Sequence, residues 1–194
     1  MTPPRTLLIA CGALAREVKA VLAANRLDQI EITCLPAILH NRPDRIPAAV
    51  HARILAARAT HDRILVLYGD CGTGGALDAM LAEEGVARIE GPHCYAFYAG
   101  EADFAALMAE EIGSFFLTDY LARHFDRLVW RGLGLDRHPE LRPMIFGHYR
   151  RLVHLVQQPD TAVTAKAEAA AARLGLPLVV RQTGVGGLTG FLAA

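Results

Sequence analysis

Short apolar runs alternate along the chain with longer segments whose apolar residues recur at helical spacing. Continuous or alternating apolar runs of this length are typical of buried β-strands, whereas a recurrence every three to four residues is typical of helices that pack one face on a core. Predicted strands cover residues 6–10, 30–35, 63–68, 87–90, 114–117, 151–156 and 178–181. Predicted helices cover residues 12–24, 48–59, 76–84, 95–100, 102–112, 120–125 and 161–174.

The regular alternation of strands and helices predicts an α/β fold. Its sheet is expected to be mostly parallel, with helices on both faces, in a Rossmann-like arrangement. The chain of 194 residues is long enough for one domain of residues 1–194 or for two small halves. The stretch 130–143 is rich in glycine and proline, and it is the candidate sub-boundary or functional loop. The Gly-rich stretch 184–190 is typical of a flexible terminus.

Composition narrows the classes of partner. Hydrophobic residues make up 53% of the chain and charged residues 21%, which fits a globular core and does not fit disorder. Lys plus Arg and Asp plus Glu both number 20, so the net charge of zero predicts neither a nucleic-acid nor a membrane partner. The apolar run 6–10 is too short for a signal peptide or a membrane span, and we therefore expect a cytoplasmic protein with reduced thiols.

Three of the four cysteines stand at the ends of predicted strands. Cys11 follows the first strand, Cys71 follows the strand 63–68, and Cys94 follows the strand 87–90 after a short turn. Ligands bind beyond the carboxyl ends of parallel strands, and nearby helix N-termini favour the thiolate form of a cysteine. Cys34 lies inside a strand and is interpreted as a core residue. Core packing remains the alternative interpretation for the other three as well.

Histidines at the same predicted edge complete a candidate metal set. His93 adjoins Cys94, and His40 follows the second predicted strand. Thiolates with one imidazole are a ligand set for zinc or for an iron–sulfur cluster. The chain has no paired C-x-x-C spacing, so such a site requires the fold to bring distant residues together.

The loop 69–75 offers a different chemistry, because Gly-rich loops between a strand and a helix can bind anions through backbone N–H groups. Candidate cofactor-binding residues are Gly69, Gly72, Thr73 and Gly74. The loop matches neither the dinucleotide fingerprint nor the Walker A pattern, and the carboxylate of Asp70 would repel a phosphate.

Polar residues near these motifs are candidates for catalytic roles. Asp70 and Glu17 are expected to orient the ligands of a metal, and Tyr68 and Asp119 to contact a substrate. Ser114 is the only serine of the chain and lacks a G-x-S-x-G elbow, which disfavours a serine hydrolase. A metal-free enzyme with Cys71 or Cys94 as nucleophile and His40 or His93 as base remains a further hypothesis.

With these motifs, the chain resembles the bacterial and archaeal domain-of-unknown-function family 1638. The resemblance extends to about Leu176. It rests on residues 8–14 with Glu17, on Leu35-Pro36, and on the segments 39–43, 68–72, 92–94 and 115–118.

The resemblance implies a role in one-carbon or methyl-group metabolism, since genes of the family often stand beside corrinoid-dependent methyltransferases. The leading hypothesis is a protein that binds zinc or an iron–sulfur cluster and acts as an enzyme on a methyl group or a thiol. The alternative is a non-catalytic accessory module that binds a corrinoid, a folate or a partner methyltransferase. The alanine-rich helices and the net charge of zero of the chain are also compatible with a homo-oligomer.

Overall fold

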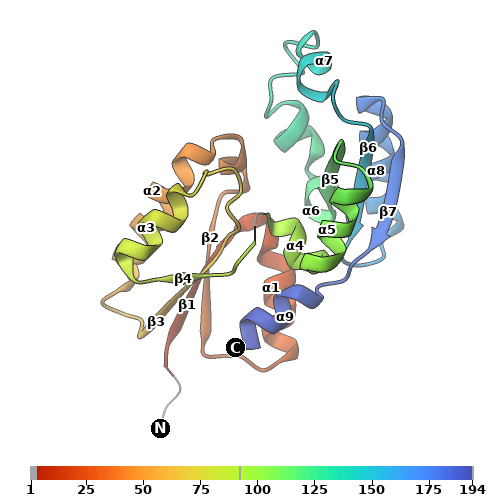
Figure 1. The fold of residues 1–194 in the computed structure, drawn as a ribbon. Helices are drawn as coiled ribbons and strands as arrows, with labels where there is room; N and C mark the ends of the chain where they lie inside the picture. Colours follow the sequence, from red (N-terminus) through yellow and green to blue (C-terminus); the bar gives the residue numbers. More distant parts are fainter. Residues whose placement is uncertain (1–3, 92, 194) are drawn as a thin grey trace. The chain divides into compact units, whose positions relative to one another are not determined.

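The computed structural model describes residues 4–91 and 93–193 and shows an α/β protein with two parallel sheets (Figure 1). The chain divides into two compact units. Unit 1 comprises residues 1–94 and 188–194, and unit 2 comprises residues 95–187. The predicted α/β fold class is confirmed. The strands form two sheets, one of four strands and one of three. The turn-rich stretch 130–143 lies inside unit 2, whereas the chain passes between the units at Cys94 and Gly187.

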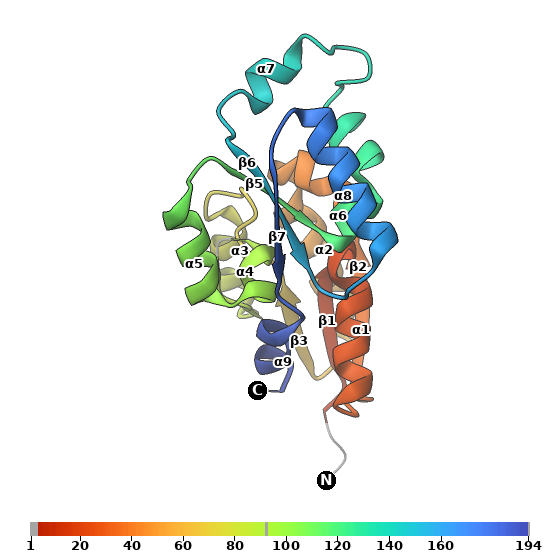
Figure 2. The same ribbon diagram turned by 90° about the vertical axis from the view of Figure 1, so that its right-hand side faces the viewer.

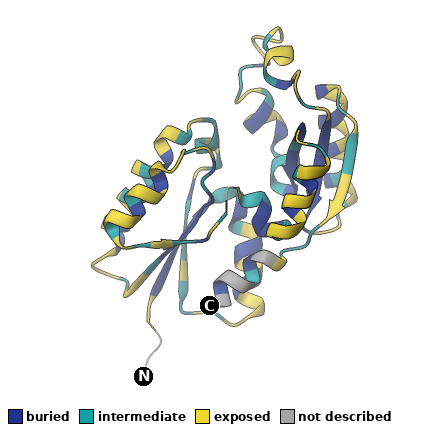
Figure 3. Ribbon diagram, in the orientation of Figure 1, coloured by how far each residue is buried: buried dark blue, intermediate teal, exposed yellow. Residues whose placement is uncertain are grey.

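Unit 1 is built on four parallel strands in the order β2-β1-β3-β4. The strands are β1 (Thr6–Cys11), β2 (Ile30–Leu35), β3 (Arg63–Leu67) and β4 (Ala87–Arg88). Every residue of β1 is buried, which matches its central place in the sheet and its continuous apolar sequence (Figure 3).

Helices cover both faces of the unit 1 sheet. Helix α1 (Ala15–Ala24) lies on one face, and α2 (Ile46–Ala57) and α3 (Ala76–Glu84) lie together on the other (Figure 1). Right-handed crossovers require this distribution, because the path from β1 to β2 runs opposite to the path from β2 through β3 to β4. Short 3₁₀ turns η1 (Gly12–Leu14), η2 (Ala37–Asn41) and η3 (Pro43–Arg45) join strand ends to helices.

Unit 2 contains three parallel strands in the order β5-β6-β7. They are β5 (Ser114–Thr118), β6 (Arg151–Val156) and β7 (Leu178–Gln182), and the central strand β6 is fully buried. Two hydrophobic clusters cover the two faces. One includes residues of α4 (Cys94–Ala99) and α5 (Glu101–Glu110), and the other includes residues of α6 (Asp119–Arg123) and α8 (Thr161–Leu174) (Figure 2).

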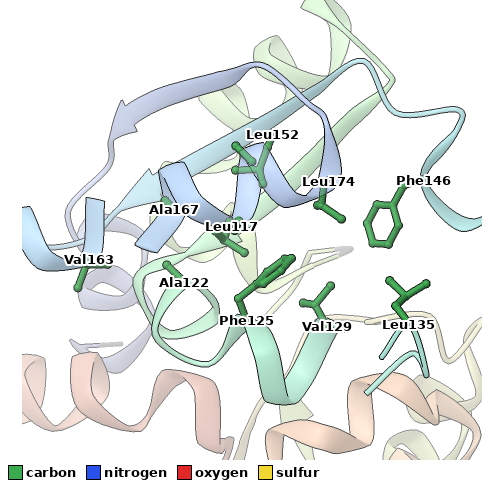
Figure 4. Packing of buried hydrophobic residues seen from close by; sticks show 12 residues of the cluster. Leu117, Ala122, Phe125, Val129, Leu135, Phe146, Leu152, Val163, Ala167 and Leu174 are labelled. Carbon is green, nitrogen blue, oxygen red and sulfur yellow. The ribbon is translucent and has the colours of Figure 1, made fainter. Parts of the chain in front are cut away.

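The larger cluster of unit 2 joins α6 and α8 to the sheet. Phe125 and Val129 from the segment after α6 point toward Leu117 and Leu174 (Figure 4). The segment continues through a π-helical turn η4 (Asp126–Trp130) and then α7 (Leu141–Phe146), which adds Phe146 to the cluster. The region that the sequence marks as turn-rich therefore contributes to a core.

Most predicted elements are confirmed within one or two residues, including the strands 30–35 and 151–156 and the helices 76–84 and 161–174. The prediction of a flexible Gly-rich terminus is wrong, because residues 186–193 form helix α9 (Gly186–Ala193). Glycine has weak helix propensity, so the sequence does not signal this helix. No helix of the described chain is both long and apolar enough to cross a bilayer.

The first residue before α8 provides a test of this local structure. Asp160 accepts hydrogen bonds from the backbone N–H groups of Ala162 and Val163, at 2.9 and 3.3 Å, and pairs with Arg123. We expect Asp160→Ala to lower the free energy of unfolding, because two N–H groups lose their acceptor. Chemical denaturation measures the change. Asp160→Asn should keep most of the stability, and a full loss in that variant would show that the ion pair, not the cap, matters.

Candidate functional site

The strand order of unit 1 reverses between β1 and β3, and two of the cysteines follow these strands. Cys11 is the last residue of β1, and Cys71 stands four residues after the end of β3. In open parallel sheets, ligands bind beyond the carboxyl ends of the strands where the order reverses. The candidate site therefore lies where this architecture favours binding.

Strand register places Tyr68 beside Cys11. Ala10 pairs with Leu67 across β1 and β3, so continuing this register by one residue brings Tyr68 next to Cys11 on the same face of the sheet. Cys34 pairs with Ala10 and therefore faces the opposite side. Cys34 is half-buried, so its interpretation as a core residue is only partly met.

His40 reaches the cysteines from the turn η2 that follows β2. Its Nδ1 atom lies 3.8 Å from the Sγ atom of Cys11 and 3.2 Å from the carbonyl oxygen of Ala37. The close approach of this turn depends on Gly12, since a Cβ atom there would lie 3.0 Å from the carbonyl oxygen of Leu35. The imidazole also hydrogen-bonds with Cys71, so His40 links the ends of β1 and β3.

Cys94 comes to Cys71 through a second close approach of backbone segments. The N–H of Asp70 donates to the carbonyl oxygen of Gly91 at 3.2 Å, and a Cβ atom on Gly69 would lie 3.0 Å from both the Cα and N atoms of His93. A side chain at Gly69 would therefore displace the segment that carries Cys94. The thiol of Cys94 hydrogen-bonds with Cys71.

Arg88 holds the same segment and is a positioning residue that sequence reasoning missed. Its guanidinium donates to the carbonyl oxygens of Ile89 and Gly91, at 2.6 and 3.3 Å, and lies 3.4 Å from that of Tyr68. Asp78 fixes the guanidinium from the other side, with an Nη2–Oδ2 distance of 2.9 Å. An arginine on a short strand carries no sequence signal for this role, because its partners are backbone atoms.

The thiols and the imidazole shift one another's proton affinity. Donation from the Cys94 thiol, together with hydrogen bonds from His40 and His93, lowers the pKa of Cys71 well below its usual range, although burial opposes the shift. The same Cys71 contact, reinforced by burial, raises the pKa of Cys94. Burial acts to lower the pKa of His40, but hydrogen bonds to Cys11 and Cys71 outweigh it and raise that pKa. The favoured state is a Cys71 thiolate beside a neutral Cys94 and an imidazolium.

The backbone at Cys71 adopts an unusual conformation. Its φ angle is +50°, in the left-handed region that residues with a side chain seldom occupy. Such strain persists where the surrounding structure holds it, and it is frequent at functional sites. The left-handed turn places Cys71, which is buried, between the end of β3 and the loop that leads to α3.

Asp70 occupies the N–H donors of the Gly-rich loop. Its carboxylate accepts hydrogen bonds from the backbone of Gly72, Gly74 and Gly75 at 3.1, 3.3 and 2.9 Å, and from the hydroxyl of Thr73 at 2.8 Å. The hydrogen bond from Gly75 and that from Thr73 are the main causes that lower the pKa of Asp70 to about 2 from 3.8. This contribution to stability is present above about pH 4 and is lost as the pH falls toward 2. The backbone N–H groups that could bind an anion are therefore already occupied by the carboxylate of Asp70 in the same loop.

The other predicted cofactor and catalytic residues fall in different places. Gly69 acts through the close approach to His93. Glu17 is buried in the first turn of α1, and His93 is exposed next to Cys94. Pro92, part of the motif 92–94, lies outside the described residues. Tyr68 is buried beside Cys11 and His40, and its ring stacks on His40 at a centroid distance of 6.3 Å.

Asp119 belongs to unit 2, where it joins buried residues that sequence reasoning left out. Its carboxylate lies 3.0 Å from Nε2 of His154 and accepts backbone N–H groups of Gln157 and Gln158 at 3.2 and 3.0 Å. Asp119, His154 and Gln157 are all nearly inaccessible to solvent. This arrangement ties the end of β5 to the end of β6, and a contact of Asp119 with a substrate stays a prediction.

Cys11, His40, Cys71 and Cys94 thus come together at one edge of unit 1, and their role as metal ligands stays a prediction. All four cysteines are free thiols. Within residues 4–91 and 93–193, however, no group of three or more His, Cys, Asp or Glu side chains is already arranged to hold a metal ion. The contacts form a linked series of pairs, from Cys11 to His40, to Cys71 and to Cys94.

The chain belongs to a family of proteins of unknown function, DUF1638, whose model matches residues 34–192. This match confirms the family resemblance, and it covers the motifs from Leu35-Pro36 onward but not residues 8–14 with Glu17. No curated protein matches the chain.

Gly69→Ala tests the close approach that carries Cys94. The added Cβ atom would meet backbone atoms of His93, which cannot rotate away, so we expect a loss of about 1–3 kcal/mol in the free energy of unfolding. Denaturant unfolding measures this loss. Gly186→Ala is the matched control, because a Cβ atom there meets nothing within 4 Å. Equal effects of the two substitutions would contradict the role of Gly69.

Proposed function

We propose that this member of the DUF1638 family binds a soft transition metal ion through Cys11, Cys71, Cys94 and His40. The observation that carries the proposal is the convergence of three thiols and one imidazole from four separate strand ends at the point where the strand order reverses. Thiolate sulfur and imidazole nitrogen are the ligands that zinc and iron–sulfur clusters take from proteins. Zinc is the first candidate and an iron–sulfur cluster the second.

One distance supports the donor set directly. Ligand bonds of about 2.3 Å to sulfur and about 2.0–2.1 Å to nitrogen, at a tetrahedral angle, separate the two donor atoms by about 3.6 Å. The Sγ atom of Cys11 and the Nδ1 atom of His40 lie 3.8 Å apart. The proposal requires Cys71 and Cys94 to adjust their side chains around the same ion, since the three thiols and His40 do not yet surround a common point.

A bound soft metal would present a thiolate for chemistry on a methyl group or a thiol, or polarise a small substrate. The protein contributes the surroundings of the ion. Burial of Cys11 and Cys71 excludes water from the ligands, and His93 stands next to Cys94 as an alternative ligand. The carboxylate of Asp70 is engaged by its own loop, which keeps it from competing with the thiols.

The cellular role that we propose is cytoplasmic one-carbon or methyl-group metabolism, and its support is the family resemblance. A small-molecule substrate such as a corrinoid or a folate, a corrinoid protein or methyltransferase as partner, and a homo-oligomeric state belong to the same proposal. A non-catalytic accessory module is the rival. In that case alanine substitutions at Cys11, Cys71 and Cys94 would leave binding of a methyltransferase intact.

Elemental analysis of protein purified without oxygen tests metal binding. We expect about one equivalent of zinc, or iron with visible absorbance if the group is a cluster, and a fall below about 0.2 equivalents in Cys71→Ser, since the central ligand is lost. Cys34→Ser is the control, because Cys34 faces the opposite side of the sheet and should retain the metal. Metal-free wild-type protein that also takes up no added zinc would overturn the proposal.

A second candidate function is a metal-free cysteine enzyme with Cys71 as nucleophile. The specific observation is the left-handed turn at Cys71, which resembles the strained strand-to-helix turn that presents nucleophiles in hydrolases. His40 contacts the Cys71 sulfur and is the candidate base.

Alkylation distinguishes this candidate. If Cys71 is a nucleophile, iodoacetamide at neutral pH should modify it at least about tenfold faster than Cys34, with or without a chelator, and His40→Ala should slow the reaction. Peptide mass spectrometry reads each site separately. Uniformly slow thiols in chelator-treated protein would exclude this candidate and leave the metal proposal standing.

A further inference from the structure

Tyr68 carries a polar group that the proposed metal site does not yet use. Its side chain is buried, with 1% of the residue exposed, and its hydroxyl is one of two buried side-chain polar atoms in the described chain that have no hydrogen-bond partner. A buried hydroxyl without a partner is unfavourable, so a native protein that keeps one usually satisfies it in another state. In such a state the acceptor for this hydroxyl must come from the groups around it.

The neighbours of the hydroxyl are sulfur atoms. Strand register places Tyr68 beside Cys11 on one face of the sheet, and Cys11 is the thiol that interacts with the hydroxyl most directly. The hydroxyl nevertheless has no hydrogen-bond partner in this structure. Stacking on His40, with an interplanar angle of 20°, holds the phenol ring against the proposed ligand set.

Cys11 already receives one hydrogen bond of the kind expected around a metal-bound sulfur. The backbone N–H of Ala13 donates to its Sγ atom at 3.4 Å, because Cys11 caps the turn η1. A neutral thiol is a weak acceptor, whereas a metal-bound thiolate accepts stronger hydrogen bonds. Partners of this kind orient a ligand and tune the affinity of the site.

We propose that Tyr68 is a positioning residue that donates a hydrogen bond from its hydroxyl to the Sγ atom of Cys11 once Cys11 binds a metal. The inference rests on the proposed function and extends it by one residue. Metal binding gives the hydroxyl its missing acceptor, and the sulfur of Cys11 then receives donors from both Tyr68 and Ala13. Tyr68 thereby stabilises the loaded state in preference to the metal-free state.

This role predicts that one substitution lowers the metal affinity without lowering the stability of the metal-free protein. Tyr68→Phe removes the hydroxyl and leaves the ring on His40. The metal-free variant should unfold at the same temperature as the wild type or a higher one, since no hydrogen bond is lost there. Its metal affinity should fall about 10- to 100-fold, which is the usual effect of removing a partner of a metal ligand. If Tyr68 had only a structural role, the substitution would lower both the unfolding temperature of the metal-free protein and its metal affinity.

Cobalt(II) is the probe, because it takes the same tetrahedral sulfur and nitrogen ligands as zinc and makes them visible. Titration of the full chain without oxygen gives the affinity, and the sulfur-to-cobalt absorption band reports the electronic state of the thiolates. Loss of a hydrogen bond to sulfur raises the energy of its lone pairs, so the band of Tyr68→Phe should move to lower energy. Tyr149→Phe, which alters a ring packed on Phe115 and Phe146 in unit 2, is the control.

The outcomes separate the two proposals. Wild-type protein that binds no cobalt or zinc overturns the proposed function and this inference together. Wild-type protein that binds cobalt, with unchanged affinity and spectrum in Tyr68→Phe, overturns only the inference. A metal-free Tyr68→Phe protein that is less stable than the wild type also overturns it, since the hydroxyl would then have a partner without the metal.

Discussion

Parallel pairing of β1 with β3 is the constraint on which the candidate site depends. It brings the end of β1, with Cys11, next to the end of β3, where Tyr68 begins the loop to Cys71. The pairing also forces the connections of β1 and β3 to leave in different directions, which opens the edge of the sheet to the turn that carries His40. Two glycines then decide how near the neighbouring segments come, because Gly12 and Gly69 each face backbone atoms at 3.0 Å from a would-be Cβ.

Charge compensation follows from this close packing. A buried thiolate is unfavourable unless a cation or hydrogen-bond donors face it, and here the imidazolium of His40 and the thiol of Cys94 serve as these partners of Cys71. Asp70 would add a second negative charge beside Cys71, but its own loop neutralises it with three N–H groups and a hydroxyl. The two anions of one loop are therefore stabilised by separate sets of donors. Either a metal ion or the histidine can supply the positive charge that the thiols require.

The sequence predicted the framework of the site better than its contacts. Apolar runs located the strands, and the ends of those strands identified Cys11, Cys71 and Cys94, because strand boundaries follow from local patterning. The position of His40 was predicted only as one of two choices, since its place depends on how η2 folds back over Gly12. The role of Arg88 and the engagement of the loop by Asp70 depend on backbone donors and acceptors, which have no signature in residue type. Helix α9 also escaped prediction, because tertiary packing determines it.

Unit 2 shows why the same pattern of strands need not produce a second site. Its strands follow the order β5-β6-β7 without reversal, so consecutive crossovers lie on one face and leave no switch point at the carboxyl ends. Asp119, directly after β5, uses both carboxylate oxygens on His154, Gln157 and Gln158. A carboxylate with this many hydrogen bonds could orient another group only by breaking some of them, and breaking buried hydrogen bonds is unfavourable. In unit 1 the carboxylate of Asp70 is satisfied in the same way by its own loop, whereas the other polar groups at the strand ends include thiols, which are weak hydrogen-bonding groups, and the unpartnered hydroxyl of Tyr68.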